Sequence, residues 1–415
     1  MVGGGWWVVG SGWWVVGGEK MDSQQCTSCA SSASSAVSGV PVSLGASNGV
    51  RLSGREWLIL AALALALFLL APALWPRFEP LASEPDYRVP YDLSNDYWLY
   101  SRYVTLAASR HELLAVGDSV VWGQYVRRDQ TLSHYLNELS SRERCANLGL
   151  DGAHPAALAG LLEHYGGGIR SKKVVLVFNP LWLSSSKHDL QGKEEFRFNH
   201  PQLVPQFSPR IPCYKEEVSG RLGAALNRNL DFSGWTNHLQ QAYFDRTDIP
   251  SWTLEHPYDS PVKALTFKLP PSDNLLRHPP VPWFQSGIKE HDFPWVELGT
   301  SLQWRCFQNC VEILRGRGNR VLVVLGPFNE HMLTADSREA YRKLQQEVAE
   351  RLRAASVPCF APEPLPSEEY ADASHPLSAG YRRLAEQLLL TQFLNDSMAH
   401  GHNDSVSAGK MPADE

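Results

Sequence analysis

The chain has 415 residues and a formal net charge of −6, from 38 Lys and Arg against 44 Asp and Glu. This balance argues against a nucleic-acid partner, because phosphate backbones are bound by basic surfaces. The length allows two average domains, or one α/β domain that carries a large insertion. We therefore expect a folded chain whose partners are neutral or uncharged.

The first 56 residues read as a low-complexity leader. The sequence GWWVVG occurs at residues 5–10 and again at 12–17, and a stretch rich in Ser, Ala and Gly follows it. Such a composition does not specify a packed core. Met21 is a candidate natural start between the two parts. Cys26 and Cys29 have CxxC spacing, but no second pair or nearby His completes a metal-ligand set, so we interpret them as part of the leader.

Residues 57–75 begin and end with tryptophan and contain no charged side chain. As a helix this stretch is about as long as the ~30 Å hydrocarbon core of a bilayer, and tryptophans favour its two interfaces. Arg51 and Arg55 before it favour a cytoplasmic N-terminal side. Arg77 and Arg88 after it weaken that bias. We expect a single-pass membrane anchor with the C-terminal domain outside the cytoplasm, in the cell envelope or periplasm.

A cleaved signal peptide is the alternative for this stretch. Residues 71–73 read Ala-Pro-Ala, which resembles a small-x-small cleavage site, but the apolar run exceeds the usual core of about 7–15 residues. Export would also permit disulfides. The cysteines after the span do not reveal a pairing, and an odd number cannot all pair; they are Cys145, Cys213, Cys306, Cys310 and Cys359.

Beyond a linker at 76–95, a domain at 96–395 alternates apolar runs with helical periodicity, and a disordered tail is expected at 396–415. The expected strands are 113–116, 174–178, 321–325 and 357–360. The expected helices are 131–141, 156–165, 296–315, 337–354 and 378–394. This alternation predicts an α/β fold with a parallel sheet covered on both faces. Residues 184–295 interrupt it with a Pro-, Trp- and His-rich insertion that has one clear helical stretch, 216–229.

Three residues predict nucleophilic catalysis. Ser119 follows the strand at 113–116 in the sequence Gly-Asp-Ser, and Asp372 precedes His375 by three positions near the end of the domain. A serine needs an imidazole to take its proton and a carboxylate to hold the imidazole. Taken singly, Ser119 could be a helix cap and His375 a loop residue. Together they predict a Ser/Asp/His triad at the carboxyl edge of the sheet.

An oxyanion hole is expected from segments that follow two strands. Gly149, in Asn-Leu-Gly-Leu-Asp-Gly, could let a backbone N–H approach a reacting carbonyl. Asn179 offers a side-chain amide directly after the strand at 174–178. Turn chemistry is the simpler explanation of each segment taken alone.

From about residue 112 to 394 the chain resembles the SGNH/GDSL hydrolase family. The Gly-Asp-Ser at 117–119, the Asn-Leu-Gly-Leu-Asp-Gly at 147–152 and the Asp-x-x-His at 372–375 carry the resemblance. It implies a three-layer α/β/α fold, with Ser119 as nucleophile, His375 as base and Asp372 as its orienter. It also implies an oxyanion hole made by the Ser119 N–H, the Gly149 N–H and the Asn179 amide. The family's Gly-x-Asn-Asp block is reduced here to Asn179 before Pro180.

Other residues carry weaker expectations. Asn329 and His331 follow the strand at 321–325 and could touch substrate, although a plain loop explains them as well. Aromatic side chains of the insertion could stack on sugar rings or simply pack a core. No histidine spacing suggests a metal site, and no cofactor is expected.

The sequence therefore predicts a serine esterase that acts on an acyl ester, with an acylated cell-envelope carbohydrate as its expected partner. An O-acyltransferase with the same triad is the first alternative, because the fate of an acyl-serine depends on how dry the pocket is. A non-catalytic carbohydrate-binding or assembly protein is the second alternative.

Overall fold

The computed structural model describes residues 52–395 except 83, 143, 273 and 275. Met21, Cys26, Cys29 and the expected tail at 396–415 lie outside the described residues. The chain divides into two compact units between Ala71 and Pro72. The cysteines of the described part are all free thiols, so no disulfide is formed there.

Helix α1 (Gly54–Phe78) contains the apolar stretch and is long and apolar enough to cross a membrane. Most of its leucines are exposed, among them Leu58, Leu63 and Leu65, which a helix buried in a protein core would not show. Residues 72–78 of the helix belong to the second unit. Both the length and the exposure suit a helix surrounded by lipid.

The second unit is built on a five-stranded parallel sheet in the order β2-β1-β3-β4-β5. The strands are β1 (Leu113–Gly117), β2 (Cys145–Gly149), β3 (Lys173–Phe178), β4 (Arg320–Leu325) and β5 (Cys359–Phe360). They are apolar and mostly buried, as strands covered on both faces must be. The parallel α/β fold is confirmed, and β2 is a strand that apolar patterning did not reveal.

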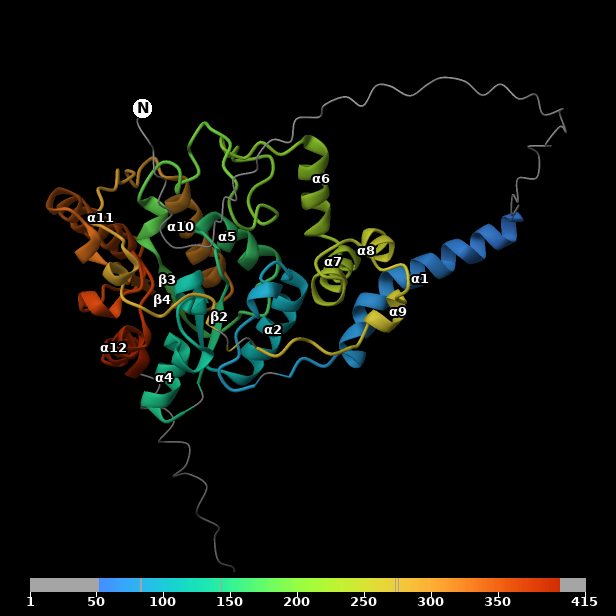
Figure 1. The fold of residues 1–415 in the computed structure, drawn as a ribbon, viewed down its shortest axis with the longest axis horizontal. Helices are drawn as coiled ribbons and strands as arrows, with labels where there is room; N and C mark the ends of the chain where they lie inside the picture. Colours follow the sequence, from blue (N-terminus) through green and yellow to red (C-terminus); the bar gives the residue numbers. More distant parts are fainter. Residues whose placement is uncertain (1–51, 83, 143, 273, 275, 396–415) are drawn as a thin grey trace, which may run out of the picture. The chain divides into compact units, whose positions relative to one another are not determined.

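Helices cover both faces of this sheet (Figure 1). Alternate strand residues such as Val175 and Val177 pack with Leu136 of α4 (Leu132–Ser140) and Leu384 of α12 (Ser378–Leu389). Phe178 points to the opposite face and meets Phe307 of α10, with ring centroids 4.6 Å apart. The remaining helices of this framework are α2 (Tyr97–Arg110), α3 (Ser119–Trp122), α5 (Pro155–His164), α10 (Leu302–Gly316) and α11 (Ala335–Ala354).

Helix α10 begins later than its periodicity suggested. The expected start was residue 296, but the Ser301 hydroxyl accepts a hydrogen bond from the Trp304 N–H and caps the helix there. The strand order reverses between β1 and β3, since β2 lies on one side of β1 while β3 to β5 lie on the other. In open parallel sheets the ligand crevice forms at such a switch point, outside the carboxyl ends of the strands. Ser119 follows β1 there and Asn179 follows β3.

The insertion is more helical than expected. The single stretch at 216–229 corresponds to α6 (Val218–Asn227), and α7 (Asp231–Tyr243), α8 (Ile249–Glu255) and α9 (Pro261–Ala264) follow it. Polar residues and prolines at their starts interrupt the apolar pattern, so hydrophobic periodicity did not reveal them. Asp248, for example, caps α8 by accepting a hydrogen bond from the Ser251 N–H. Helix α7 packs on α2, so much of the insertion extends the fold away from the carboxyl edge.

Residues 76–95 do not form a free linker. Arg88 and Leu93 are buried, and Glu79 is wholly enclosed. Arg88 donates hydrogen bonds to the carbonyls of Trp122 and Gly123 at the end of α3. The segment is therefore part of the domain and supports the turn that follows β1.

Candidate active site

Ser119 is the first residue of α3, directly after β1. The preceding Asp118 caps the helix, with its Oδ1 accepting from the Val120 N–H at 3.0 Å. Gly117 is required by packing, because a Cβ there would lie 2.6 Å from a methyl carbon of Val121. The Ser119 N–H lies in the first turn and has no intrahelical acceptor. The local sequence thus fixes both the serine side chain and an available backbone donor.

His375 joins the serine to Asp372. Its Nε2 lies 2.8 Å from the Ser119 Oγ, and its Nδ1 lies 2.8 Å from the Asp372 Oδ2. The backbone N–H groups of Ser374 and His375 also donate to the Asp372 Oδ1, both at 2.9 Å. Ser119, Asp372 and His375 are all at most 3% exposed. The structure therefore brings the three predicted residues together in one hydrogen-bonded chain.

The charges of this chain shift its pKa values in opposite directions. Burial lowers the pKa of His375, but the Asp372 carboxylate outweighs it and the pKa is raised. The carboxylates of Asp118 and Asp151 act in the same direction. Burial raises the pKa of Asp372, but His375 and the two backbone donors outweigh it and the pKa is lowered. A neutral imidazole beside an ionised carboxylate can accept a proton from a hydroxyl.

Asn179 lies beside this chain and is held by Asp118. Its Nδ2 donates to the Asp118 Oδ2 at 2.8 Å, and its Oδ1 accepts from the Leu181 N–H at 3.0 Å. The Trp182 indole donates to the same carboxylate oxygen at 2.9 Å. One of the two N–H bonds of the amide is thus used to fix its orientation, and the second remains for another acceptor. Pro180 opens a short 3-10 helix after Asn179 without moving the amide from Asp118.

Gly149 has a packing task that the sequence did not reveal. A Cβ there would lie 2.3 Å from the Trp122 nitrogen, so only glycine lets β2 approach α3 this closely. Its N–H donates to the Asn147 Oδ1 at 2.9 Å and is therefore already engaged. Gly152, in the turn after β2, has a φ of +70° and an N–H that donates to no acceptor in the described part of the chain. Gly152 is therefore a backbone donor of this segment that remains available.

Asn329 supports the loop of the triad, and His331 contacts a different loop. Asn329 is fully buried and donates through its Nδ2 to the Asp372 carbonyl at 3.1 Å, while its own N–H donates to the Ala373 carbonyl at 2.8 Å. The His331 Nε2 lies 3.1 Å from the Leu365 carbonyl. The Asn329 side chain is fully used within the fold, whereas His331 is exposed and its contact with substrate stays a prediction.

Four further residues surround the triad, and sequence reasoning did not assign them. Tyr125 lies against His375, with ring centroids 5.5 Å apart, and His278 of the insertion lies against Tyr125 at 5.2 Å. The Gln124 Nε2 lies 3.4 Å from the His278 Nε2. Burial and the nearby Asp372 raise the pKa of Tyr125. The only available signal was that residues 124–125 follow the Gly-Asp-Ser turn closely.

Asp151 is the fourth of these residues and is a buried carboxyl group. The Leu150 N–H beside it donates to the Gly117 carbonyl at 3.1 Å, which places Asp151 next to the serine turn. Burial raises the pKa of Asp151 to about 6, against the opposing charge of His375. Its Oδ1 has no hydrogen-bond partner among the described residues, and the same holds for the Gln124 Oε1. Two buried acceptors in this neighbourhood are thus left for a hydroxyl or a water.

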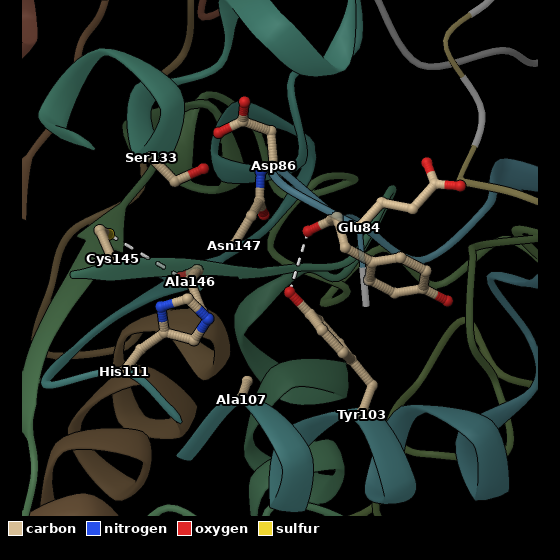
Figure 2. A pocket seen from close by; sticks show the side chains of 10 residues that line it. Glu84, Asp86, Tyr103, Ala107, His111, Ser133, Cys145, Ala146 and Asn147 are labelled. Carbon is tan, nitrogen blue, oxygen red and sulfur yellow. Dashed lines mark hydrogen bonds between the residues drawn. The ribbon is translucent and has the colours of Figure 1, made fainter. Parts of the chain in front are cut away.

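A small pocket elsewhere in the fold is shown in Figure 2. It lies beside the edge strand β2 and is bordered by Tyr103 of α2 and by Glu84 and Asp86. In this pocket the Tyr103 hydroxyl donates a hydrogen bond to the Tyr87 carbonyl at 2.9 Å. None of Ser119, Asp372 and His375 lines this hollow, so it is separate from the candidate site.

The described residues contain no group of three or more His, Cys, Asp or Glu side chains arranged to hold a metal ion. No family model matches the sequence, and no curated protein is significantly similar to it. The assignment of a chemistry therefore depends on the geometry around Ser119.

Proposed function

We propose that the protein is a serine esterase of the SGNH/GDSL type that forms an acyl-serine intermediate on Ser119. The hydrogen-bonded chain Ser119–His375–Asp372 carries this proposal. The Gly-Asp-Ser and Asp-x-x-His sequences and the parallel sheet with a switch point beside Ser119 also support it. A degenerate binding protein would not need all three members of the chain at hydrogen-bonding distance.

In the proposed first half-reaction the Ser119 Oγ attacks the ester carbonyl while His375 Nε2 takes the hydroxyl proton. The imidazolium, stabilised by Asp372, then gives that proton to the leaving alkoxide as the C–O bond breaks. In the second half-reaction His375 deprotonates a water, which attacks the acyl carbonyl. The carboxylic acid leaves, and Ser119 regains its proton.

The developing oxyanion would be stabilised by donors around the serine. The Ser119 N–H and the second N–H of the Asn179 amide are the proposed donors, with Gly152 replacing Gly149 as the backbone donor from the turn after β2. Preorganised donors of this kind account for much of the rate enhancement in acyl transfer. Asp118 fixes the amide before the substrate arrives.

An acyl group carried by a cell-envelope carbohydrate remains our proposed substrate class, with the domain on the outer side of the membrane that α1 would cross. Arg51 and Arg55, which precede the apolar stretch 57–75, support this orientation. The two unpartnered acceptors, Asp151 Oδ1 and Gln124 Oε1, suit the hydroxyl groups of such a substrate.

An O-acyltransferase on the same residues is the second candidate. The observation that favours it is the burial of Ser119, which is only 3% exposed. A site that keeps water away from an acyl-serine favours transfer to a bound hydroxyl. The two activities share the first half-reaction and differ only in the acceptor.

The test is labelling of the full-length protein with a fluorophosphonate, followed by assay with a short-chain p-nitrophenyl ester. We expect labelling and turnover in the wild type, and neither in Ser119→Ala. His375→Ala should lose turnover with an unchanged far-UV circular dichroism spectrum. Ser374→Ala, whose hydroxyl makes no hydrogen bond among the described residues, is the matched control and should keep both.

Labelling of Ser119→Ala, or turnover by His375→Ala, would reject the triad. An unlabelled but folded wild type would favour the non-catalytic alternative. Adding a sugar alcohol to the ester assay and detecting its acyl ester by mass spectrometry separates the transferase from the esterase.

A further inference from the structure

The large apolar side chains that the second unit exposes are concentrated in one part of the chain. In the described residues 79–217 only Phe207 belongs to this class, and in 277–395 only Phe284 and Leu390. Leu74 and Phe78 lie at the end of α1. Residues 218–276 contain the others, which are Val218, Leu222, Leu226, Leu230, Leu254, Tyr258, Val262, Phe267 and Leu276. An apolar surface concentrated in this way is typical of a binding face.

The part of this surface on and around α8 and α9 is the most exposed. Leu254 is 82% exposed, Tyr258 is 99% exposed and Val262 is 77% exposed. We call Leu254, Tyr258, Val262 and Phe267 the apolar strip. Figure 1 shows α7, α8 and α9 grouped together, away from the sheet. These four exposed apolar side chains lie within fourteen positions of the chain. A group of this kind lowers the solubility of a protein unless a partner or a membrane covers it.

One end of the strip contacts the last turn of α1. Phe267 lies against Trp75 and Phe78, with ring centroids 5.0 and 6.3 Å apart. Trp75 also packs against Trp235 of α7, 5.5 Å away. Aromatic side chains at the end of a membrane-spanning helix mark the bilayer interface. The strip therefore begins where the span ends.

We propose that the apolar strip inserts into the interfacial layer of the bilayer that α1 spans, so that α8 and α9 seat the catalytic unit on the membrane surface. This inference assumes the proposed membrane attachment of α1 and does not depend on the esterase activity. Acidic and basic side chains are nearly balanced around the strip, with Lys263 and Lys268 set against Glu255 and Asp259. The seating is therefore apolar rather than electrostatic, and it does not require anionic lipid.

The test uses the full-length protein in lipid nanodiscs, with Cys26, Cys29 and Cys359 replaced by Ser. Single cysteines carry an environment-sensitive NBD label at Leu254→Cys, Tyr258→Cys or Leu390→Cys. Leu254 and Leu390 are matched, because each is 82% exposed in the protein alone. Leu65→Cys in the middle of α1 reports the span itself.

We expect the labels at 254 and 258 to be quenched by shallow doxyl lipids and to show several-fold weaker quenching by aqueous iodide than the label at 390. The same result should hold in zwitterionic lipid and at high salt. If iodide quenches the labels at 254 and 258 as strongly as the label at 390 while the label at 65 is in lipid, the strip does not insert, although α1 still spans the membrane. A label at 65 in water would overturn both. Ester hydrolysis by these variants reports the proposed function separately.

Discussion

Asp118 accepts hydrogen bonds from three groups that come from different parts of the chain: the Val120 N–H, the Asn179 amide and the Trp182 indole. It lies one residue before the serine and is 3% exposed. The aspartate of the Gly-Asp-Ser sequence thus caps α3 and orients the proposed oxyanion donor at the same time. Two of these partners, Val120 and Asn179, are buried, which favours a fixed orientation of the amide.

Replacing Asn179 with Ala should lower kcat about 10²–10³-fold with little change in KM, because the amide would act on charge that develops only in the transition state. Steady-state kinetics with a p-nitrophenyl ester measures the effect. Trp182→Phe is the matched control, since it removes another donor to Asp118 but keeps the amide, and it should stay within a few-fold of wild type. A wild-type rate for Asn179→Ala would show that the amide points elsewhere.

The pH dependence should reveal the charges around His375. The base must be neutral to act, so kcat/KM should rise with pH and level off above the raised pKa of this histidine. Asp151 contributes to that raised pKa once it is ionised, above about pH 6. Asp151→Asn should therefore move the rising limb to lower pH. Glu347→Gln, on α11, is the control; equal shifts in both variants would contradict the local effect.

At the scale of elements, a buried ionic cluster connects the end of α1 to α7 and α2. The His238 Nε2 lies 2.9 Å from the Glu79 Oε2, and its Nδ1 lies 2.6 Å from the Asp96 Oδ2. Trp75 and Arg102 also donate to the Glu79 carboxylate. Burial lowers the pKa of His238, but Asp96 and Glu79 outweigh it and raise the pKa to about 9. Burial raises the pKa of Glu79, but His238 leads the groups that lower it to about 2.

These shifts predict how stability depends on pH. The raised pKa of His238 contributes stability that is complete below its ordinary value of 6.5 and is lost as pH rises through about 9. The lowered pKa of Glu79 contributes above 4.5 and is lost as pH falls through about 2. The contribution of this pair to the free energy of unfolding should therefore be largest between these ordinary values, as urea titration of the detergent-solubilised wild type and of His238→Gln can measure.

Replacing His238 with Gln should cost about 3–5 kcal/mol of the free energy of unfolding, because two buried carboxylates lose the imidazolium charge between them. The variant should also lose the decline on the alkaline side. His256→Gln, in the same segment, is the control and should keep the wild-type pH dependence. A loss below about 1 kcal/mol for His238→Gln would mean that water reaches the cluster.

The elements that could be predicted from the sequence are those whose signal is local. The cores of β1, β3 and β4 are uninterrupted apolar runs, so their positions were found to within about a residue. Strand β2 carries Asn147, whose side chain bonds to the Val121 carbonyl at 2.8 Å, and this buried polar residue hid the strand. Helices α8 and α9 are too short to show a hydrophobic periodicity, and α7 packs on α2, a contact that no local pattern predicts.

The whole molecule should remain bound to membranes by α1. A reporter that is active only outside the cytoplasm, fused after Asn395, should be active, and the protein should stay in the membrane fraction through a high-salt wash. Salt weakens electrostatic attachment but not the burial of an apolar helix. A reporter fused at the N-terminus is the control and should be inactive. Release with a new N-terminus near Leu74 would indicate cleavage instead.

The residues of the candidate site that could be predicted from the sequence are those that belong to short motifs. Ser119 follows a strand and Asp372 lies three residues from His375, so their spacing alone was enough to predict them as catalytic candidates. Arg88 was read as part of a linker, and its bonds to the end of α3 depend on packing that no local pattern encodes. The sequence suggested Gly149 as a flexible backbone donor, whereas in the structure its lack of a side chain lets the backbones of β2 and α3 approach closely.

The hydrogen bond between Ser119 and His375 joins residues 256 positions apart. A ribosome makes the chain from its N-terminus, so α1 and the nucleophile emerge long before the base. During synthesis the nascent chain therefore holds a serine without a proton acceptor. A chain that stops before residue 375 would contain α1 but could not form the triad. Reactivity would thus arise only after synthesis of the last strand and its following loop.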